Sequence, residues 1–189
     1  PLADTARSPP ATGKAKAGTV AEAVRVGAGG GRGRGDLRNE NEKCMLADPG
    51  RLAASANGWG MPLLAMIYAR GPKISNEYDP EVVAHCARVG VELGADVVKV
   101  CYTGDMESFS RVVEACCIPV MIAGGAKMDS TRDLLQMVHD SLRAGGGGIS
   151  LGRNVFQHEQ PKKLMRALRG LVHEDWDVDQ AMGLMEDNS

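Results

Sequence analysis

Residues 94–105 read GADVVKVCYTGD, a short apolar run set between two glycines. After its first residue, the stretch from Asp96 to Tyr102 is apolar on both faces except at one position, which is typical of a strand buried in a parallel sheet. The exception is Lys99. The glycines before and after the run indicate turns at both ends of the strand.

Similar units repeat on both sides of this strand. Apolar strands are predicted at 62–68, 118–123 and 148–151, and their spacing is that of alternating strands and helices in a parallel α/β sheet. The helices are predicted at 42–56 (interrupted or bent at Pro49), 80–94, 108–116, from Asp129-Ser130 onward, 161–172 and 178–185. Four such units make about half of a (β/α)8 barrel, which typically takes about 250 residues. The sequence therefore predicts an α/β fold that is a partial TIM barrel, its C-terminal half, over residues 42–189.

The N-terminal segment differs from the rest of the chain in amino-acid composition and hydrophobic pattern. Residues 1–41 contain GAGGGRGRG at positions 27–35, and only residues 19–26 have helical spacing. A run so rich in glycine and arginine buries too little side-chain surface to offset the conformational entropy lost on ordering. We therefore expect residues 1–41 to be irregular or disordered. The RGRG segment is too short to indicate a nucleic-acid-binding tail.

Composition narrows the class of protein. The chain has 189 residues, 43% of them hydrophobic, with a formal net charge of -2, which argues against a dedicated nucleic-acid binder. No apolar run of membrane-spanning length or signal peptide is found, so we expect a cytoplasmic enzyme without a membrane partner. Five cysteines and four histidines show no metal-ligand spacing, and we expect reduced thiols, no metal and no cofactor.

Lys99 is the first candidate catalytic residue. A lysine in a buried strand loses hydration, which lowers the pKa of its amine and leaves a neutral fraction able to attack a carbonyl. A class I aldolase, which works through a lysine Schiff base, requires such an amine. The alternative is an edge-strand lysine that reaches solvent.

Tyr68 is the second candidate. With period-two alternation, Leu64, Met66 and Tyr68 share one face of their strand, as Val97, Lys99 and Cys101 do on the next. If both faces point into a barrel, the phenol and the amine stand on adjacent strands near the C-terminal rim, where a tyrosine can move a proton. Taken alone, a tyrosine at this position is more often a core residue whose hydroxyl has a hydrogen-bond partner.

Two glycine turns complete the candidate site. Gly124 and Gly125 follow one predicted strand, and Gly152 with Arg153 follows the next. Glycine lets backbone N–H groups approach an anion, and the last two strands of a barrel are the usual phosphate site. Arg153 adds a cation able to bind phosphate through two nitrogens.

Four strings together resemble a known family: GMPLLAMIYARG, GADVVKVCYTGD, PVMIAGGAKMD and SLGRNVFQH. They are similar to the archaeal-type class I fructose-bisphosphate aldolases and 2-amino-3,7-dideoxy-D-threo-hept-6-ulosonate synthases. The resemblance implies a Schiff-base aldolase or transaldolase acting on a phosphorylated ketose or aldehyde. It implies that Lys99 forms the imine, Tyr68 transfers the proton, and Gly124, Gly125, Gly152 and Arg153 hold the phosphate. We also expect a homo-oligomer, because a half barrel leaves two sheet edges and one inner face unpaired.

The chain also departs from that family. Nothing in residues 1–41 matches the family's first strand with its aspartate, and GGGRGRGDLR stands where its fourth strand is expected. A slip of reading frame in this segment is one hypothesis. A catalytically inactive homologue or assembling subunit is an alternative function, and a doubly wound phosphate-binding module is an alternative fold that gives Lys99 no role.

Overall fold

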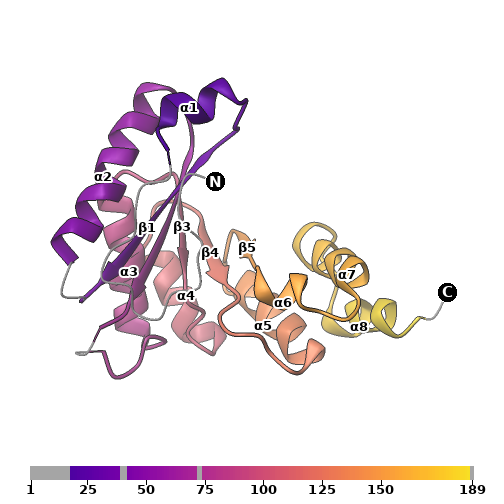
Figure 1. Ribbon diagram of the computed structural model, residues 1–189. Helices are drawn as coiled ribbons and strands as arrows, with labels where there is room; N and C mark the ends of the chain where they lie inside the picture. The colour runs from indigo at the N-terminus through magenta and orange to yellow at the C-terminus, as the bar shows by residue number, and fades with distance from the viewer. Residues whose placement is uncertain (1–17, 39–41, 72–73, 188–189) are drawn as a thin grey trace.

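The computed structural model of the chain describes residues 18–38, 42–71 and 74–187. Within them, parallel strands form one sheet, and helices follow the strands along the chain (Figure 1). The strands are β1 (Gly31–Leu37), β2 (Leu63–Ala69), β3 (Val97–Val100), β4 (Val120–Ala123) and β5 (Gly148–Ser150). The helices are α1 (Val20–Arg25), α2 (Glu42–Gly58), α3 (Pro80–Glu92), α4 (Met106–Glu114), α5 (Thr131–Arg143), α6 (Arg153–Phe156), α7 (Pro161–His173) and α8 (Val178–Glu186).

The order of strands in the sheet is the order of strands in the chain, β1-β2-β3-β4-β5. A doubly wound sheet reverses its order at a switch point, whereas successive units of a (β/α)8 barrel do not. The α/β class and the partial barrel are thereby confirmed, and the doubly wound alternative is excluded. The described part of the chain has five strands in place of the four predicted units.

The additional strand, β1, corrects the prediction of irregular structure, which is wrong for residues 31–37. β1 pairs with β2 in parallel from Gly31 opposite Leu63 to Leu37 opposite Ala69. The physical reason is the alternation of the segment, in which glycines face α2 and charged side chains face the other way. A Cβ added at Gly33 would lie 3.3 Å from Cδ2 of Leu52 on α2, so glycine permits close helix packing. Residues 1–17 and 39–41 of the segment predicted irregular lie outside the described residues.

Helix α2 also differs from its prediction. It runs from Glu42 to Gly58 without the expected interruption, although Pro49 lies inside it. Pro49 is buried, and its Cα lies 3.6 Å from the position of a Cβ on Gly33. The helix is therefore continuous where it packs on the glycine face of β1, although Pro49 removes one of its backbone hydrogen bonds.

One face of the sheet carries the core. Helix α2 packs on β1, and α3 packs on β2 and β3. Strand positions that face the helices are buried, while the alternate positions of β2, β3 and β4 are half-buried except at Tyr68. We call the second side the inner face, and it carries the side chains of Arg32, Arg34, Leu64, Met66, Val97, Lys99 and Met121. Leu64, Met66 and Val97 are half-buried on this face, whereas Cys101 is buried at 7% exposure.

Candidate active site

Lys99 lies on the inner face of β3, directly across from Met66 on β2 and Met121 on β4. Its side chain is half-buried. Burial lowers the pKa of the Lys99 amine, the Arg32 and Arg34 guanidinium groups lower it further, and the Cys101 thiol acts in the opposite direction. Lys99 is therefore on an interior strand, not an edge strand, and its environment favours the neutral amine that attacks carbonyls.

Tyr68 lies near the carboxyl end of the adjacent strand β2 and is 8% exposed. Two guanidinium groups lie against its ring, with Cζ of Arg34 5.2 Å and Cζ of Arg70 5.0 Å from the ring centroid. Burial, followed by the Cys101 thiol, raises the pKa of Tyr68 to about 12, and the two arginines act against that rise. A phenol that keeps its proton at neutral pH can serve as a general acid.

Each arginine beside Tyr68 is held by a carboxylate. Arg34 donates from Nε and Nη2 to the two oxygens of Asp36, at 3.0 and 3.1 Å. Arg70 donates from Nε to Oε2 of Glu77 at 2.9 Å. The Arg34–Asp36 pair fixes the Arg34 guanidinium against the ring, because a carboxylate that accepts two parallel bonds orients the whole fork. Arg70 is held by a single bond.

The two glycine turns meet beyond the ends of β4 and β5. Arg153 donates from Nη2 to the carbonyl of Gly125 at 2.8 Å, and the buried amide of Asn154 donates to the carbonyl of Gly124 at 2.6 Å. Gly125 has φ of +63°, a conformation that favours glycine. A Cβ at Gly124 would lie 2.9 Å from Cδ2 of Leu151 and 3.1 Å from Nδ2 of Asn154, so a side chain there would require these neighbours to shift.

Asn154 is the residue that joins these turns, and sequence reasoning did not select it. Its Nδ2 also donates to the Ala126 carbonyl at 3.0 Å, and its Oδ1 accepts from the Met128 backbone N–H at 2.7 Å. Its position in the string GRN, directly after a predicted phosphate arginine, was the available signal. Sequence reasoning also did not select Arg70, although it lies two residues after the candidate Tyr68 in the string AMIYARG.

Arg34 and Asp36 were also missed, for a different reason. Their segment was predicted to be irregular from its composition. The overlooked signal is the strict alternation of residues 31–36, GRGRGD, which has the period of a strand.

All of these groups lie toward the edge of the sheet that is formed by the carboxyl ends of its strands. Tyr68 and Lys99 are near the carboxyl ends of β2 and β3, and the glycine turns follow β4 and β5. Parallel strands bring their carboxyl ends to the same edge, which is where barrel enzymes build their active sites. The structure thus places every site residue predicted from the sequence at that edge. It brings Gly124, Gly125, Gly152 and Arg153 into one cluster, with Lys99 and Tyr68 on neighbouring strands of the same face.

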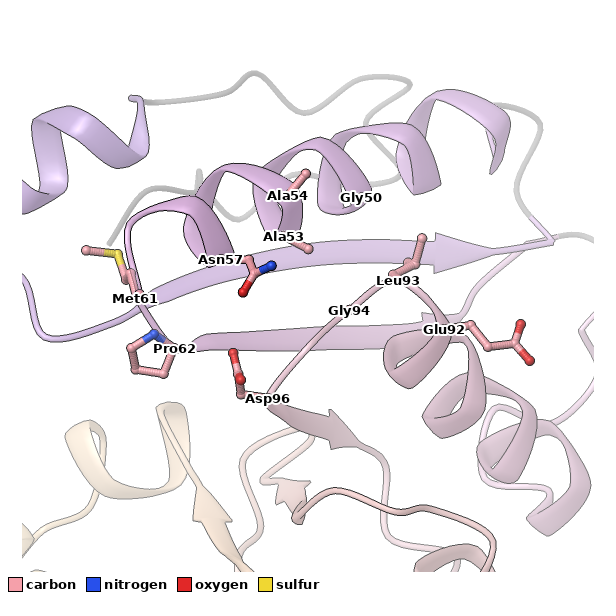
Figure 2. A pocket seen from close by; sticks show the side chains of 11 residues that line it. Gly50, Ala53, Ala54, Asn57, Met61, Pro62, Glu92, Leu93, Gly94 and Asp96 are labelled. Carbon is pink, nitrogen blue, oxygen red and sulfur yellow. The ribbon is translucent and has the colours of Figure 1, made fainter.

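A cavity of about 470 Å³ lies at the opposite edge of the sheet, where the strands begin (Figure 2). It is lined by Asn57 at the end of α2, and by Met61, Pro62 and Asp96 just before β2 and β3 begin. Asp96 accepts a hydrogen bond from the Leu63 backbone N–H at 2.8 Å, which ties the two strand starts together. This end of a barrel contributes stability, and the cavity brings none of the candidate catalytic groups together.

Comparison with known proteins agrees with this geometry. The sequence profile described as DeoC/LacD family aldolase matches residues 3–158. The chain belongs to this aldolase family. The 2-amino-3,7-dideoxy-D-threo-hept-6-ulosonate synthase of Halobacterium salinarum is 41% identical over 95% of the chain and 67% of its own length. The 2-amino-4,5-dihydroxy-6-oxo-7-(phosphonooxy)heptanoate synthase of Streptomyces griseus is 37% identical over 90% of the chain and 62% of its own length.

A solved structure extends the family relationship to the fold. An archaeal fructose-1,6-bisphosphate aldolase, whose catalytic lysine is covalently bound to the carbinolamine intermediate of the substrate, is similar with a TM-score of 0.81 and 37% identity. The match covers 84% of this chain and 64% of that chain. This chain therefore spans about two thirds of the length of the relatives it matches.

The described residues contain no group of three or more His, Cys, Asp or Glu placed to hold a metal ion. In the same residues, no helix has the length and apolar character needed to cross a membrane.

Proposed function

We propose that this aldolase-family chain forms a Schiff base with a phosphorylated ketose at Lys99 and makes or breaks a carbon-carbon bond. The observation that carries the proposal is the position of Lys99: half-buried on an interior strand, beside two arginines, with a lowered amine pKa. A neutral lysine amine in such a setting is the nucleophile of imine-forming enzymes.

The reaction begins when the Lys99 amine adds to the ketone carbon to give a carbinolamine. Loss of water, with a proton donated to the leaving hydroxyl, gives an iminium ion. In the cleavage direction the hydroxyl on the far carbon of the scissile bond loses its proton, that bond breaks, and its electron pair moves into the iminium to give an enamine. An aldehyde leaves. Protonation of the enamine and addition of water then release the second product and restore the amine.

Tyr68 is the proton carrier of this scheme. It stands on the strand beside Lys99, and its raised pKa, about 12, keeps the phenol protonated and ready to donate to a leaving hydroxyl. Arg34 and Arg70 stabilise the phenolate that remains after the transfer, because each guanidinium lies about 5 Å from the ring centroid.

Gly124, Gly125, Gly152 and Arg153 bind the phosphate next to the ketone. Backbone N–H groups at glycine turns and an arginine fork are groups that recognise phosphate. Among the described residues, Arg153 gives one side-chain N–H to the Gly125 carbonyl, and its other donors are available to a ligand.

The relatives suggest the class of substrate. The name of the Streptomyces griseus relative describes a ketone with a phosphate on the neighbouring carbon and a carboxylate at the other end of the molecule. Fructose 1,6-bisphosphate, named for the archaeal aldolase, has a phosphate at each end. We assign this chain a linear phosphoketose with an anionic group at both ends. No cofactor takes part in this scheme, and a cytoplasmic location is part of the proposal.

The test is covalent trapping of fructose 1,6-bisphosphate with borohydride, followed by peptide mass analysis. The reduced adduct is expected on Lys99 and is expected to disappear in Lys99→Arg, because a guanidinium does not form an imine at ordinary pH. Lys162→Arg, at an exposed lysine on α7, is the matched control and should label normally.

Labelling that persists in Lys99→Arg would contradict the assignment of the imine. A folded chain that traps no ketose would support the alternative of a catalytically inactive homologue. Circular dichroism of each variant separates either outcome from loss of the fold.

A further inference from the structure

The segment GRGRGD of β1 carries cations that the proposed reaction has not used. Arg32 and Arg34 project from the inner face of β1, the same face that carries Lys99. Arg34 lies across from Met66, and Met66 lies across from Lys99, so the three residues form one row over adjacent strands. Neighbouring strands are about 4.8 Å apart, which puts the backbones of β1 and β3 about 10 Å from each other.

The positive charge of this region is only partly balanced. Asp36 holds Arg34 in an ion pair of 3.0 Å, in which the Asp36 carboxylate is the more buried partner. Arg32 forms no ion pair with any residue in the described ranges, and its buried Nε has no hydrogen-bond partner there. A buried guanidinium N–H without an acceptor is costly, and an anionic ligand would remove that cost.

The position of these arginines relative to the other candidate groups is informative. The sheet order puts β1 and β2 on one side of β3, the strand that carries Lys99, and β4 and β5 on the other. Figure 1 shows β4 and β5 following β3. The glycine turns with Arg153 follow β4 and β5, so the two cationic regions lie on opposite sides of the imine-forming lysine. A ligand held at Lys99 by its ketone and at Arg153 by the neighbouring phosphate would extend its remaining carbons toward β1.

We propose that Arg32 and Arg34 form a second anion-binding site, which takes the charged group at the end of the ketose far from its first phosphate. This inference rests on the proposed function, since that function supplies the ligand and its orientation. Arg32 is the principal contact because its buried Nε has no hydrogen-bond partner among the described residues, and Arg34 contributes the N–H groups that do not bond Asp36. The group bound is a carboxylate or a phosphate, both of which match the guanidinium fork.

The experiment compares three phosphoketoses that share a phosphate next to the ketone and carry different far-end groups. Borohydride trapping is measured against concentration for fructose 1,6-bisphosphate, for 2-amino-4,5-dihydroxy-6-oxo-7-(phosphonooxy)heptanoate, and for fructose 1-phosphate, which has no far-end anion. Arg32→Met should raise the half-saturating concentration of a ligand with the matching far-end anion about tenfold or more, and leave fructose 1-phosphate within about twofold. A loss for the bisphosphate alone identifies a phosphate site, and a loss for the heptanoate alone identifies a carboxylate site.

The ratio between ligands is the decisive quantity. Arg32 also lowers the pKa of Lys99, but an effect on the amine changes trapping of all three ligands equally and cancels in the ratio. Arg88→Met, at an exposed arginine on α3, is the control and should leave the ratio unchanged. Arg32→Lys keeps the charge and should recover part of the discrimination. Equal losses for all three ligands in Arg32→Met would overturn the second site.

A second readout does not depend on the imine. In protein labelled with ¹⁵N-arginine, the Nε–H resonance of Arg32 is identified by its loss in Arg32→Met. It should shift on addition of fructose 1,6-bisphosphate or the heptanoate to Lys99→Arg protein, and not on addition of fructose 1-phosphate. If it shifts while the wild-type chain traps no ketose, the proposed reaction fails and the anion site stands. If trapping succeeds and neither far-end anion moves the resonance, the anion site fails and the reaction stands.

Discussion

The guanidinium of Arg34 lies over the ring of Tyr68, with Cζ 5.2 Å from the ring centroid, and Asp36 holds it there through two hydrogen bonds. Asp36 and Tyr68 are themselves opposite one another across β1 and β2. The carboxylate therefore acts on the phenol in two ways. It orients a cation that stabilises the phenolate, and its own negative charge disfavours the same phenolate.

Asp36→Asn should lower the pKa of Tyr68 from its value of about 12. The substitution removes a negative charge that raises this pKa, and asparagine can still accept a hydrogen bond from Arg34. Absorbance of the phenolate, titrated against pH and corrected with Tyr68→Phe in the same background, measures the change. An unchanged or higher pKa would mean that Asp36 acts mainly by keeping Arg34 in place.

The pH dependence of imine formation should follow the Lys99 amine. Only the neutral amine attacks, so the trapping rate rises with pH and levels off above the Lys99 pKa, which is below the ordinary lysine value. Arg32→Met removes a cation that lowers this pKa, and the rising limb should move to higher pH. Arg88→Met should leave the limb in place, since Arg88 does not contribute to the pKa of Lys99. A limb that moves to lower pH in Arg32→Met would contradict the electrostatic account.

Arg153→Ala should weaken binding of a phosphoketose by ~1.5–3 kcal/mol, the contribution of a hydrogen bond to a charged group. Binding of the unphosphorylated sugar should change much less. Isothermal titration with fructose 1-phosphate and with fructose measures both. Since Arg153 also bonds the Gly125 carbonyl, the thermal midpoint of the variant is recorded alongside. Equal losses for the two sugars would place the phosphate elsewhere.

Two helical glycines should respond in opposite ways to alanine. A Cβ at Gly90 on α3 would lie 2.4 Å from Cγ1 of Val98, on the strand that carries Lys99. Gly90→Ala should therefore destabilise the fold by ~1–3 kcal/mol through overpacking. A Cβ at Gly183 on α8 meets nothing within 4 Å, and Gly183→Ala should stabilise by ~0.5–1 kcal/mol. Urea denaturation measures both, and stabilisation of both would show that α3 can move away from β3.

The sequence predicted best where local pattern and tertiary environment agree. Apolar runs gave β2 to β5 within a few residues, and Ser130 caps α5 as expected, accepting a hydrogen bond from the Asp133 backbone N–H. Lys99 and Tyr68 could be placed because period-two alternation fixes which residues share a face. Composition misled at β1, because a glycine-rich segment that is a poor strand former alone is held by pairing with β2 and by α2 packed on its glycines.

Contacts between loops could not be derived in the same way. The bond from Asn154 to the Gly124 carbonyl joins residues far apart in the chain, and no periodicity encodes it. The arginine fork of Arg34 over Tyr68 depends on the register of β1 against β2, which the sequence did not specify once β1 was taken as irregular.

The last prediction concerns the inner face. Leu64, Met66 and Val97 are only half-buried there, next to Arg32, Arg34 and Lys99, and β1 and β5 are the two edges of the sheet in the described residues. Strand edges and partly exposed apolar side chains both favour association between chains. We therefore expect residues 1–189 to form a homo-oligomer, to bind a hydrophobic dye, and to turn over fructose 1,6-bisphosphate slowly even if the imine forms.

Sedimentation velocity, near-ultraviolet dichroism and turnover are measured on the same sample. Met66→Gln should weaken association by making the centre of the inner face polar, whereas Met165→Gln, at an exposed methionine on α7, should not. A monomer with sharp tertiary signals and fast turnover would show that the inner face is complete as it stands.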